Sequence, residues 1–194
     1  DNEQSDLRAL ATDPALLSNV STLMMASLET EEFQSAHDKF IASLQPRLAP
    51  SAFLEVSLLS PDDGQVIAST TASEEGQFKA DQPYFKNALS APFVGNPTYS
   101  SVQNAFVMTA SSPLFTADGD LLGILAARLD LASLNAVIAR RTNLHETDDA
   151  YLVDMSNLFV AQPRLINDQS ILQTGIHTED VNRCLQKQSG VVQA

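Results

Sequence analysis

Two runs of β-forming residues separated by a tight turn constrain the fold of this chain more than any other feature. The runs cover residues 105–111 and 121–131, and the connection between them contains Asp118-Gly119. An Asp-Gly pair between two apolar runs is a strong signal of a β-hairpin, because glycine readily adopts the backbone conformation of such a turn. The middle of the chain is therefore predicted to contain two antiparallel strands.

The residues on either side of this hairpin change to helix and loop patterns. Residues 81–89 predict a short helix, because Asp81 can cap its start and Pro83 fits its first turn. Residues 92–99 are irregular and aromatic, and a further helix is expected from residue 132 onward. Helix, aromatic loop and hairpin together are interpreted as the part of the chain that forms a pocket.

A second hairpin is predicted earlier in the chain. Residues 52–59 and 65–70 have strand character, and the turn sequence Pro61-Asp62-Asp63-Gly64 separates them. Residues 71–79 follow as a polar loop. Two hairpins joined through one short helix indicate a mixed fold of class α+β.

The first 47 residues carry the apolar periodicity of helices. The pattern is broken or bent near Asp13-Pro14, which is a helix start signal, and Thr30 offers a second N-cap. A straight helix of about 45 residues would be about 65 Å long, which exceeds the diameter of a small domain. Residues 1–47 are therefore expected to form a long spine that packs on more than one module or on a second copy of the chain.

The last quarter of the chain repeats the order of the middle. Its predicted elements are a strand at 150–154, a turn at Ser156-Asn157, a return strand at 158–161, a helix at 178–188 capped by Thr178, and the start of a strand at 190. The final hairpin of the first unit has no counterpart here. The chain is therefore divided into the spine, a complete module at 48–142 and an incomplete module at 143–194.

Composition excludes some partners. The chain has 194 residues, of which 44% are hydrophobic, and 24 acidic against 11 basic residues give a net charge of −13. Such a charge repels phosphate, so nucleic acid is excluded as the main partner and an anionic membrane surface is disfavoured. No apolar run approaches the ~20 residues that span a membrane, and no signal peptide is visible at Asp1. The abrupt ends favour a water-facing part excised from a larger protein.

The sequence contains no pattern typical of catalysis or of metal binding. His37, His145 and His177 are isolated, and the single cysteine, Cys184, excludes a disulfide within the chain. Neither a Gly-x-Ser-x-Gly elbow nor a phosphate-binding glycine loop is present. We therefore expect no enzyme activity, no metal site and no cofactor.

One charged residue interrupts the second of the two central β-runs. The run is apolar from Leu121 to Ala127 and then carries Arg128. A buried arginine requires a partner, because an unpaired buried charge is unfavourable, and Asp81, Asp130 or a bound anion could supply one. A guanidinium binds a carboxylate with two parallel hydrogen bonds, so Arg128 is a candidate for holding a small anion. The alternative is that Arg128 pairs internally or faces solvent.

Aromatic residues near the predicted short helix are candidates for the walls of the same site. Tyr84 and Phe85 belong to that helix, and Tyr99 lies in the irregular loop that follows. All three could pack against a small ligand. Plain core packing is an equal alternative for Tyr84 and Phe85.

Four stretches, taken in order, resemble the extracellular double Cache family, also called tandem PAS-like or PDC sensor domains. They are the long N-terminal helix, DQPYFKNAL, FVMTASSPLFTADGDLLGILAARLDLASL and RRTNLHETDDAYLVD. The resemblance implies a long helix followed by two modules, each with an antiparallel sheet of about five strands flanked by helices. It also implies a ligand site in the membrane-distal module, here 48–142, closed by the short helix and its loop.

Amino-acid-binding members of this family have an Arg-x-Trp-Tyr motif at the short helix, where the arginine takes the ligand carboxylate. In this chain the motif falls on Gln82-Pro83-Tyr84-Phe85, so Gln82 replaces the arginine. In those members a carboxylate on the final strand takes the ligand amine. That position falls on Arg128 here, which inverts its charge. The resemblance therefore implies a ligand site but departs from the pattern for α-amino acids.

The resemblance implies the outer, extracellular or periplasmic, part of a membrane receptor: a sensor histidine kinase, a diguanylate cyclase or a chemoreceptor. In the full-length protein a membrane helix would follow, and the signal would pass as a ligand-induced shift of population along the spine. The rival hypothesis is a structural module that forms a homodimer through its N-terminal helix, or meets a partner protein, without a ligand. A cavity where Arg128 and Tyr99 converge would favour the sensor, and a filled apolar core would favour the rival.

Overall fold

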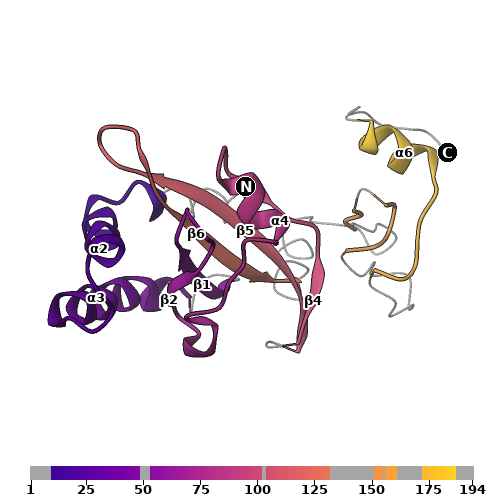
Figure 1. The fold of residues 1–194 in the computed structure, drawn as a ribbon. Helices are drawn as coiled ribbons and strands as arrows, with labels where there is room; N and C mark the ends of the chain where they lie inside the picture. Colours follow the sequence, from indigo (N-terminus) through magenta and orange to yellow (C-terminus); the bar gives the residue numbers. More distant parts are fainter. Residues whose placement is uncertain are drawn as a thin grey trace.

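The computed structural model describes residues 10–48, 53–101, 104–131, 151–154, 156–160 and 172–186. Its elements, in chain order, are α2 (Pro14–Met25), α3 (Glu31–Leu48), β1 (Phe53–Leu59), β2 (Val66–Ser69), the 3-10 helix η1 (Ala72–Glu74), α4 (Pro83–Ala88), β3 (Phe93–Val94), β4 (Thr98–Ser100), β5 (Ala105–Phe115), β6 (Leu121–Asp130) and α6 (Glu179–Leu185). Two N-terminal helices thus precede an antiparallel sheet (Figure 1). The predicted α+β class is confirmed.

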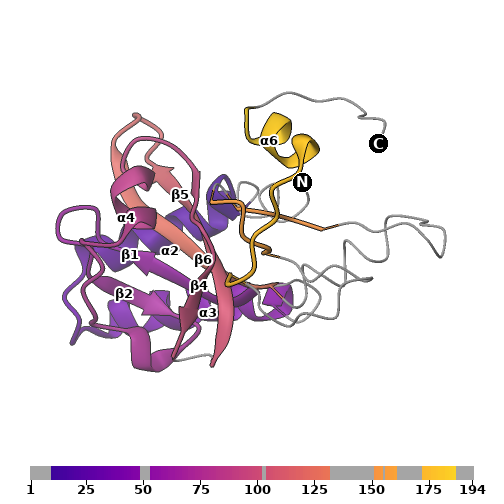
Figure 2. The same cartoon turned by 90° about the vertical axis from the view of Figure 1, so that its right-hand side faces the viewer.

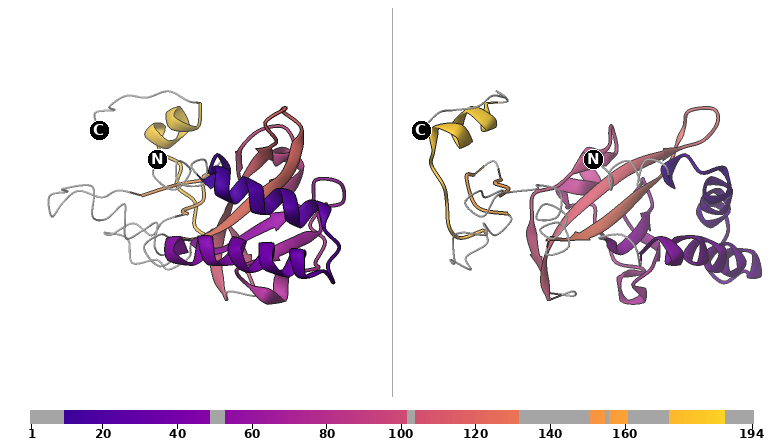
Figure 3. Two further views of the ribbon diagram at one scale, coloured as in Figure 1. Left: turned by 90° about the vertical axis from the view of Figure 1, so that its left-hand side faces the viewer. Right: turned by 180° about the vertical axis from the view of Figure 1, so that it is seen from behind.

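The N-terminal helices are two separate elements. The side chain of Asp13 accepts a hydrogen bond from the backbone of Ala15 at the start of α2, as its sequence predicts. The chain leaves the helix at Ala26, which is extended, and Thr30 starts α3 by accepting a hydrogen bond from the backbone of Phe33. Figure 3 shows α2 and α3 side by side on one face of the sheet. The prediction of one long spine is therefore corrected to a pair of packed helices.

The sheet contains six strands in the order β2-β1-β6-β5-β3, with β4 also paired to β5, and every pairing is antiparallel. Both predicted hairpins are present, β1–β2 and β5–β6. Gly119 has a φ of +92° in the turn between β5 and β6, a conformation that favours glycine. Strand β5 extends beyond residue 111 to Phe115, because the hairpin pairing continues to the turn.

The main core lies between the two N-terminal helices and the sheet. Buried residues from both layers form it, among them Leu16, Val20, Leu23, Phe40, Leu44, Val56, Leu58, Leu125 and Leu129. The apolar stripe of α2 thus packs on the sheet through Val20 and Leu23, whereas Leu28 beyond the end of α2 is 58% exposed. A smaller cluster fills the opposite face, where α4 packs against β5 and β6 (Figure 2).

The second unit is described only in part. Asn157 has a φ of +65° in the predicted turn, and the bridge Val153–Phe159 is the only β pairing in the described residues between the two predicted strands. A second bridge joins Leu158 to Gly175, and Thr178 caps α6 by accepting from the backbone of Val181. The helix predicted from residue 132 and the strand predicted at 190 lie outside the described residues.

Candidate functional site

A cavity of about 420 Å³ opens on the face of the sheet that carries α4. This volume lies within the range of small-molecule sites in proteins, about 300–1,000 Å³. Its lining residues come from η1 and the segment after it, the start of α4, strands β3 to β6 and the connection between β3 and β4. They are Glu74, Lys79, Gln82, Pro83, Tyr84, Phe93, Gly95, Asn96, Thr98, Tyr99, Ser100, Ser101, Val107, Thr109 and Arg128.

Strand alternation explains why charged groups meet on this face. Successive side chains of a strand point to opposite faces. In β6, Leu125, Ala127 and Leu129 enter the core under the N-terminal helices, so Arg128 points to the other face. In β1, Glu55 alternates with Val56 in the same way and stands directly opposite Arg128 in the β1–β6 pairing. The register of the sheet therefore places the carboxylate of Glu55 beside the guanidinium of Arg128.

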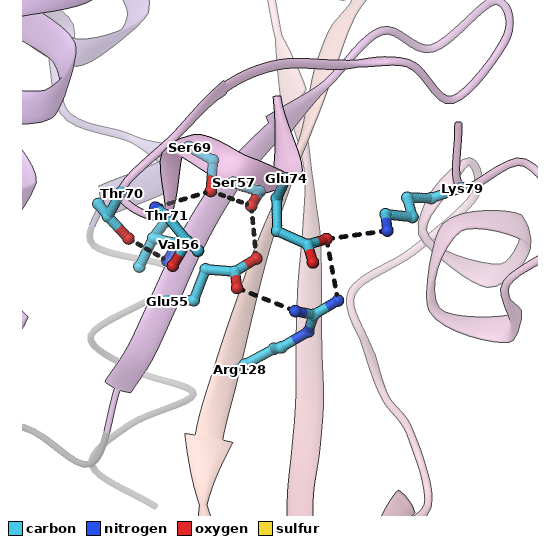
Figure 4. Close-up of polar contacts among 9 residues, drawn as sticks. All are labelled: Glu55, Val56, Ser57, Ser69, Thr70, Thr71, Glu74, Lys79 and Arg128. Atoms are coloured by element: carbon cyan, nitrogen blue, oxygen red, sulfur yellow. Dashed lines mark hydrogen bonds and ion pairs between the residues drawn. The ribbon is translucent and has the colours of Figure 1, made fainter. Parts of the chain in front are cut away.

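Two carboxylates hold the guanidinium of Arg128 (Figure 4). Nη1 donates to Oε2 of Glu55 at 2.9 Å, and Nη2 donates to Oε2 of Glu74 at 3.3 Å. The Arg128 side chain is 16% exposed, and those of Glu55 and Glu74 are 4% and 6% exposed. Burial by itself would lower the pKa of Arg128, but the negative charges of Glu55 and Glu74 outweigh it and raise this pKa, so the residue stays charged.

Glu74 joins a second cation to this group. The same Oε2 atom accepts from Nζ of Lys79 at 2.8 Å, so one carboxylate oxygen bridges Lys79 and Arg128. Burial favours the neutral acid, but the hydrogen bonds and charges of Lys79 and Arg128 outweigh it and lower the pKa of Glu74. Glu74 is therefore ionised at neutral pH.

Glu55 is anchored deeper in the sheet. Its Oε1 accepts from Oγ of Ser57 at 2.9 Å, and that hydroxyl lies 2.9 Å from Oγ of Ser69 on β2. Oγ of Ser69 in turn accepts from the backbone N–H of Thr71 (Figure 4). Oε1 of Glu55 is thus held by Ser57 of its own strand, which leaves Oε2 to hold Arg128 of β6.

A second contact, made by the residue after Glu74, connects this segment to α3. Oε1 of the next residue, Glu75, accepts from the backbone N–H of Ser69 at 2.9 Å and lies 2.7 Å from Nε2 of His37. His37 is half-buried and stacks on Phe33, with 6.2 Å between the ring centroids. Glu74 and Glu75 therefore contact opposite sides, the cavity and the helix.

Two tyrosines, Tyr84 and Tyr99, add aromatic rings to the lining of the cavity, and neighbouring residues hold both of them in place. Oγ of Ser111 on β5 donates to the backbone carbonyl of Tyr84 at 2.8 Å, which fixes the start of α4. Burial, together with the charges of Glu74 and Glu55, raises the pKa of Tyr84 to about 12, so its phenol stays neutral. The hydroxyl of Tyr99 donates to Asn104 at 2.6 Å, and its ring meets Phe106 edge-on at 5.5 Å.

The structure brings together four of the seven residues predicted for the site. Arg128, Tyr84, Tyr99 and Gln82 line the cavity, although the Tyr99 side chain is largely exposed. The other three, Phe85, Asp81 and Asp130, are not among the lining residues. Phe85 is 5% exposed and packs in the smaller core cluster, Asp81 is fully exposed beside Lys86, and Asp130 ends β6.

Sequence reasoning missed the partners of Arg128. They are Glu55 and Glu74, whereas Asp81, Asp130 or a bound anion had been named as candidates, so Arg128 pairs internally but with other residues. A signal for Glu55 existed, since it is the only charged residue in the apolar run of β1. The polar segment that holds Glu74 and Lys79 carries no periodic pattern, so nothing in it marks which charges turn inward.

Other types of site find no support in the part of the chain that the structure describes. Among these residues, no group of three or more histidine, cysteine, aspartate or glutamate side chains is placed to hold a metal ion. No helix among them is long and apolar enough to cross a membrane.

Solved structures resemble this fold. The chain matches the sensory domain of the Campylobacter jejuni chemoreceptor Tlp3 with isoleucine bound, at TM-score 0.61 and 21% identity, covering 96% of this chain and 70% of that one. It matches the sensor domain of the V. cholerae histidine kinase DctB at TM-score 0.58 and 14% identity, covering 80% of this chain and 56% of that one. It matches the ligand-binding domain of the Pseudomonas aeruginosa PAO1 amino-acid chemoreceptor PctC, in complex with GABA, at TM-score 0.51 and 22% identity, covering 83% of this chain and 69% of that one. The chain thus spans little more than half of the DctB chain.

Family membership rests on sequence as well as on fold. No curated protein matches the chain in sequence. The family described as Cache domain (dCache_1) matches residues 2–191, nearly the whole chain. Cache domains bind ligands for signalling receptors and are not catalytic. The chain therefore belongs to the Cache domain family.

Proposed function

We propose that this chain is the extracytoplasmic sensing part of a transmembrane receptor, and that it binds a small carboxylate-bearing molecule in the cavity at Arg128. One observation carries the proposal. The charged residues that line the cavity are two cations, Arg128 and Lys79, and one carboxylate, Glu74, whereas Glu55, the second carboxylate at Arg128, does not line it. The cluster of four is neutral as a whole, 2 − 2 = 0, but two of the three charges that line the cavity are cations, which can hold a carboxylate by charge-assisted hydrogen bonds.

Hydrogen-bonding capacity supports the same ligand class. A guanidinium has five N–H donors and an ammonium has three. The two carboxylates take one donor from each of Nη1 and Nη2 of Arg128, and Glu74 takes one from Lys79. Thr98 and Thr109, whose side chains carry hydroxyls, also line the cavity. The cavity therefore offers charged donors for a carboxylate and hydroxyls for the rest of a small polar ligand.

The similar structures add chemical support. Isoleucine in Tlp3 and GABA in PctC both carry a carboxylate. By the resemblance, Gln82 falls where the amino-acid-binding members have the arginine of their motif, and Arg128 falls where those members have a carboxylate on the final strand. We therefore propose a carboxylate ligand that does not depend on an α-amino group. The cavity at Arg128 and Tyr99 argues against the rival idea of a module with a filled core.

The proposed arrangement follows the predicted modules. Residues 48–142 would form the membrane-distal, ligand-binding module and residues 143–194 the start of the membrane-proximal one. The signal would pass to a membrane helix beyond this sequence. A ligand can shift such an equilibrium only by its difference in affinity for the two states.

The test is to replace Arg128 with Gln and to measure thermal shifts with a panel of small carboxylates and their matched amides. We expect the carboxylates, and not the amides, to stabilise the wild-type domain, and the effect to disappear in Arg128→Gln. A shift of equal size in the variant would overturn the role of Arg128. A panel in which amides bind as well as acids would overturn the carboxylate class.

A further inference from the structure

The two carboxylates that hold Arg128 differ in how they are supported. Glu55 lies in β1, next to β6 in the sheet, and both of its oxygens are occupied, by Ser57 and by Arg128. Glu74 lies in the three-residue helix η1, outside the sheet, and lines the cavity. One carboxylate is therefore part of the scaffold, and the other reaches the guanidinium from a connecting segment.

Glu74 also makes the contacts that a ligand anion would make. Its Oε2 lies 2.8 Å from Nζ of Lys79 and 3.3 Å from Nη2 of Arg128. These are the two cations that line the cavity. A carboxylate that enters the cavity must share these donors with Glu74 or take its place.

We propose that Glu74 is the specificity-determining residue of this site: it occupies the anion position between Arg128 and Lys79 in the unliganded domain, and a ligand carboxylate displaces it. This inference rests on the proposed function and deepens it. It restricts the ligand to molecules that can replace a carboxylate at both cations. A neutral polar molecule cannot, because it would either leave Glu74 in place or leave Lys79 without this carboxylate and Arg128 with Glu55 alone.

Replacing Glu74 by a ligand carboxylate changes the free energy of the site little, as a reversible sensor requires. A ligand carboxylate gains charge-assisted hydrogen bonds at the position where Glu74 loses them, and Glu55 keeps Arg128 in place throughout. The competition weakens every carboxylate by a similar factor, so Glu74 selects carboxylates as a class over neutral molecules, and further contacts with the cavity walls decide which carboxylate binds. Removing Glu74 should therefore strengthen the binding of even the simplest carboxylate.

Chemical rescue tests this directly. Glu74→Ala removes the side-chain fragment that acetate replaces, and acetamide is the neutral analogue of the same shape. Binding of acetate and acetamide is measured by isothermal titration, and thermal unfolding is measured in acetate, acetamide and sodium chloride at one ionic strength. Glu29→Ala, which removes an exposed glutamate in the connection between α2 and α3, is the matched control. Glu74→Gln removes the charge with little change of shape and serves as the second variant should the alanine variant fold poorly.

We expect both Glu74 variants to bind acetate at least about tenfold more tightly than the wild type, since Glu74 no longer competes for Lys79 and Arg128 and one charge-assisted hydrogen bond alone corresponds to that factor. Acetate, and not acetamide, should restore the unfolding temperature of Glu74→Ala, and Arg128→Gln in the same background should abolish the rescue. Equal acetate affinity in wild type, Glu29→Ala and both Glu74 variants, lost with Arg128→Gln, would overturn the role of Glu74 and leave the proposed function standing. Absence of acetate binding in every variant, including Glu74→Ala, would overturn both.

Discussion

Glu55 offers the sharpest test of the charge arrangement, because its contribution can be estimated from its contacts. The side chain is 4% exposed, and its two oxygens accept from Arg128 and from Ser57, each at 2.9 Å. Glu55→Gln keeps the shape but removes the charge, so the loss is that of hydrogen bonds to a charged group, about 1.5–3 kcal/mol. Glu55→Ala removes both bonds and leaves Arg128 with Glu74 alone, so we expect about 3–5 kcal/mol, the cost of breaking a buried pair.

The chain contains no tryptophan, so urea unfolding is best followed by far-ultraviolet circular dichroism. A domain of this size has a total stability of about 5–15 kcal/mol, so the larger loss would move the unfolding midpoint clearly. A double-mutant cycle with Arg128→Met isolates the pair. We expect Glu55→Leu with Arg128→Met to be more stable than the sum of the single losses, because neither buried charge is left unpaired. A loss below about 0.5 kcal/mol for Glu55→Gln, at unchanged denaturant dependence, would refute the buried pair.

Two further measurements examine Glu74 and Phe85. The pKa of Glu74 is lowered in the folded domain from its ordinary value of 4.5, so its stabilising contribution is complete above that value and is lost as the pH falls through the folded pKa. The stability difference between wild type and Glu74→Gln should therefore shrink as the pH is lowered below 4.5, and a constant difference would contradict the ion pairs. Phe85 is 5% exposed in the cluster with Leu59, Val66 and Ile124, so Phe85→Ala should cost about 3–5 kcal/mol of unfolding free energy. A small stability loss with a large loss of ligand binding would show instead that Phe85 is a wall of the site.

Local sequence signals predicted the elements of the fold well, because each depends on a few neighbouring residues. Asp13, Thr30 and Thr178 cap helices as expected, and Gly119 forms the turn of the central hairpin. The cap expected from Asp81 is wrong, because the N-cap of α4 is Gln82 and no side chain caps this helix. The break between α2 and α3 was underestimated. Thr30 marked the start of α3, but only packing against the sheet shows that the chain turns back there.

Only part of the site could be predicted from the sequence, and the reason is physical. Arg128 stood out because one charge in an apolar run must be paired when the run is buried. The identity of its partners depends on strand register, which places Glu55 opposite Arg128 across a separation of 73 residues. Glu74 and Lys79 depend on the path of an irregular segment, which has no period to read. The same limit explains why Asp81, close to the short helix in sequence, lies outside the cavity.

A single peptide bond separates Glu74, at the cavity, from Glu75, which lies 2.7 Å from His37 on α3. Under the proposed displacement of Glu74, the contacts of Glu74 at the cavity and the contact of Glu75 with His37 are energetically coupled. Linkage is reciprocal: if a ligand that moves Glu74 loosens the contact of Glu75 with α3, then any change that tightens this contact weakens the ligand by the same factor. Substitutions on α3 at His37, remote from the cavity, would thereby tune the concentration at which the domain responds.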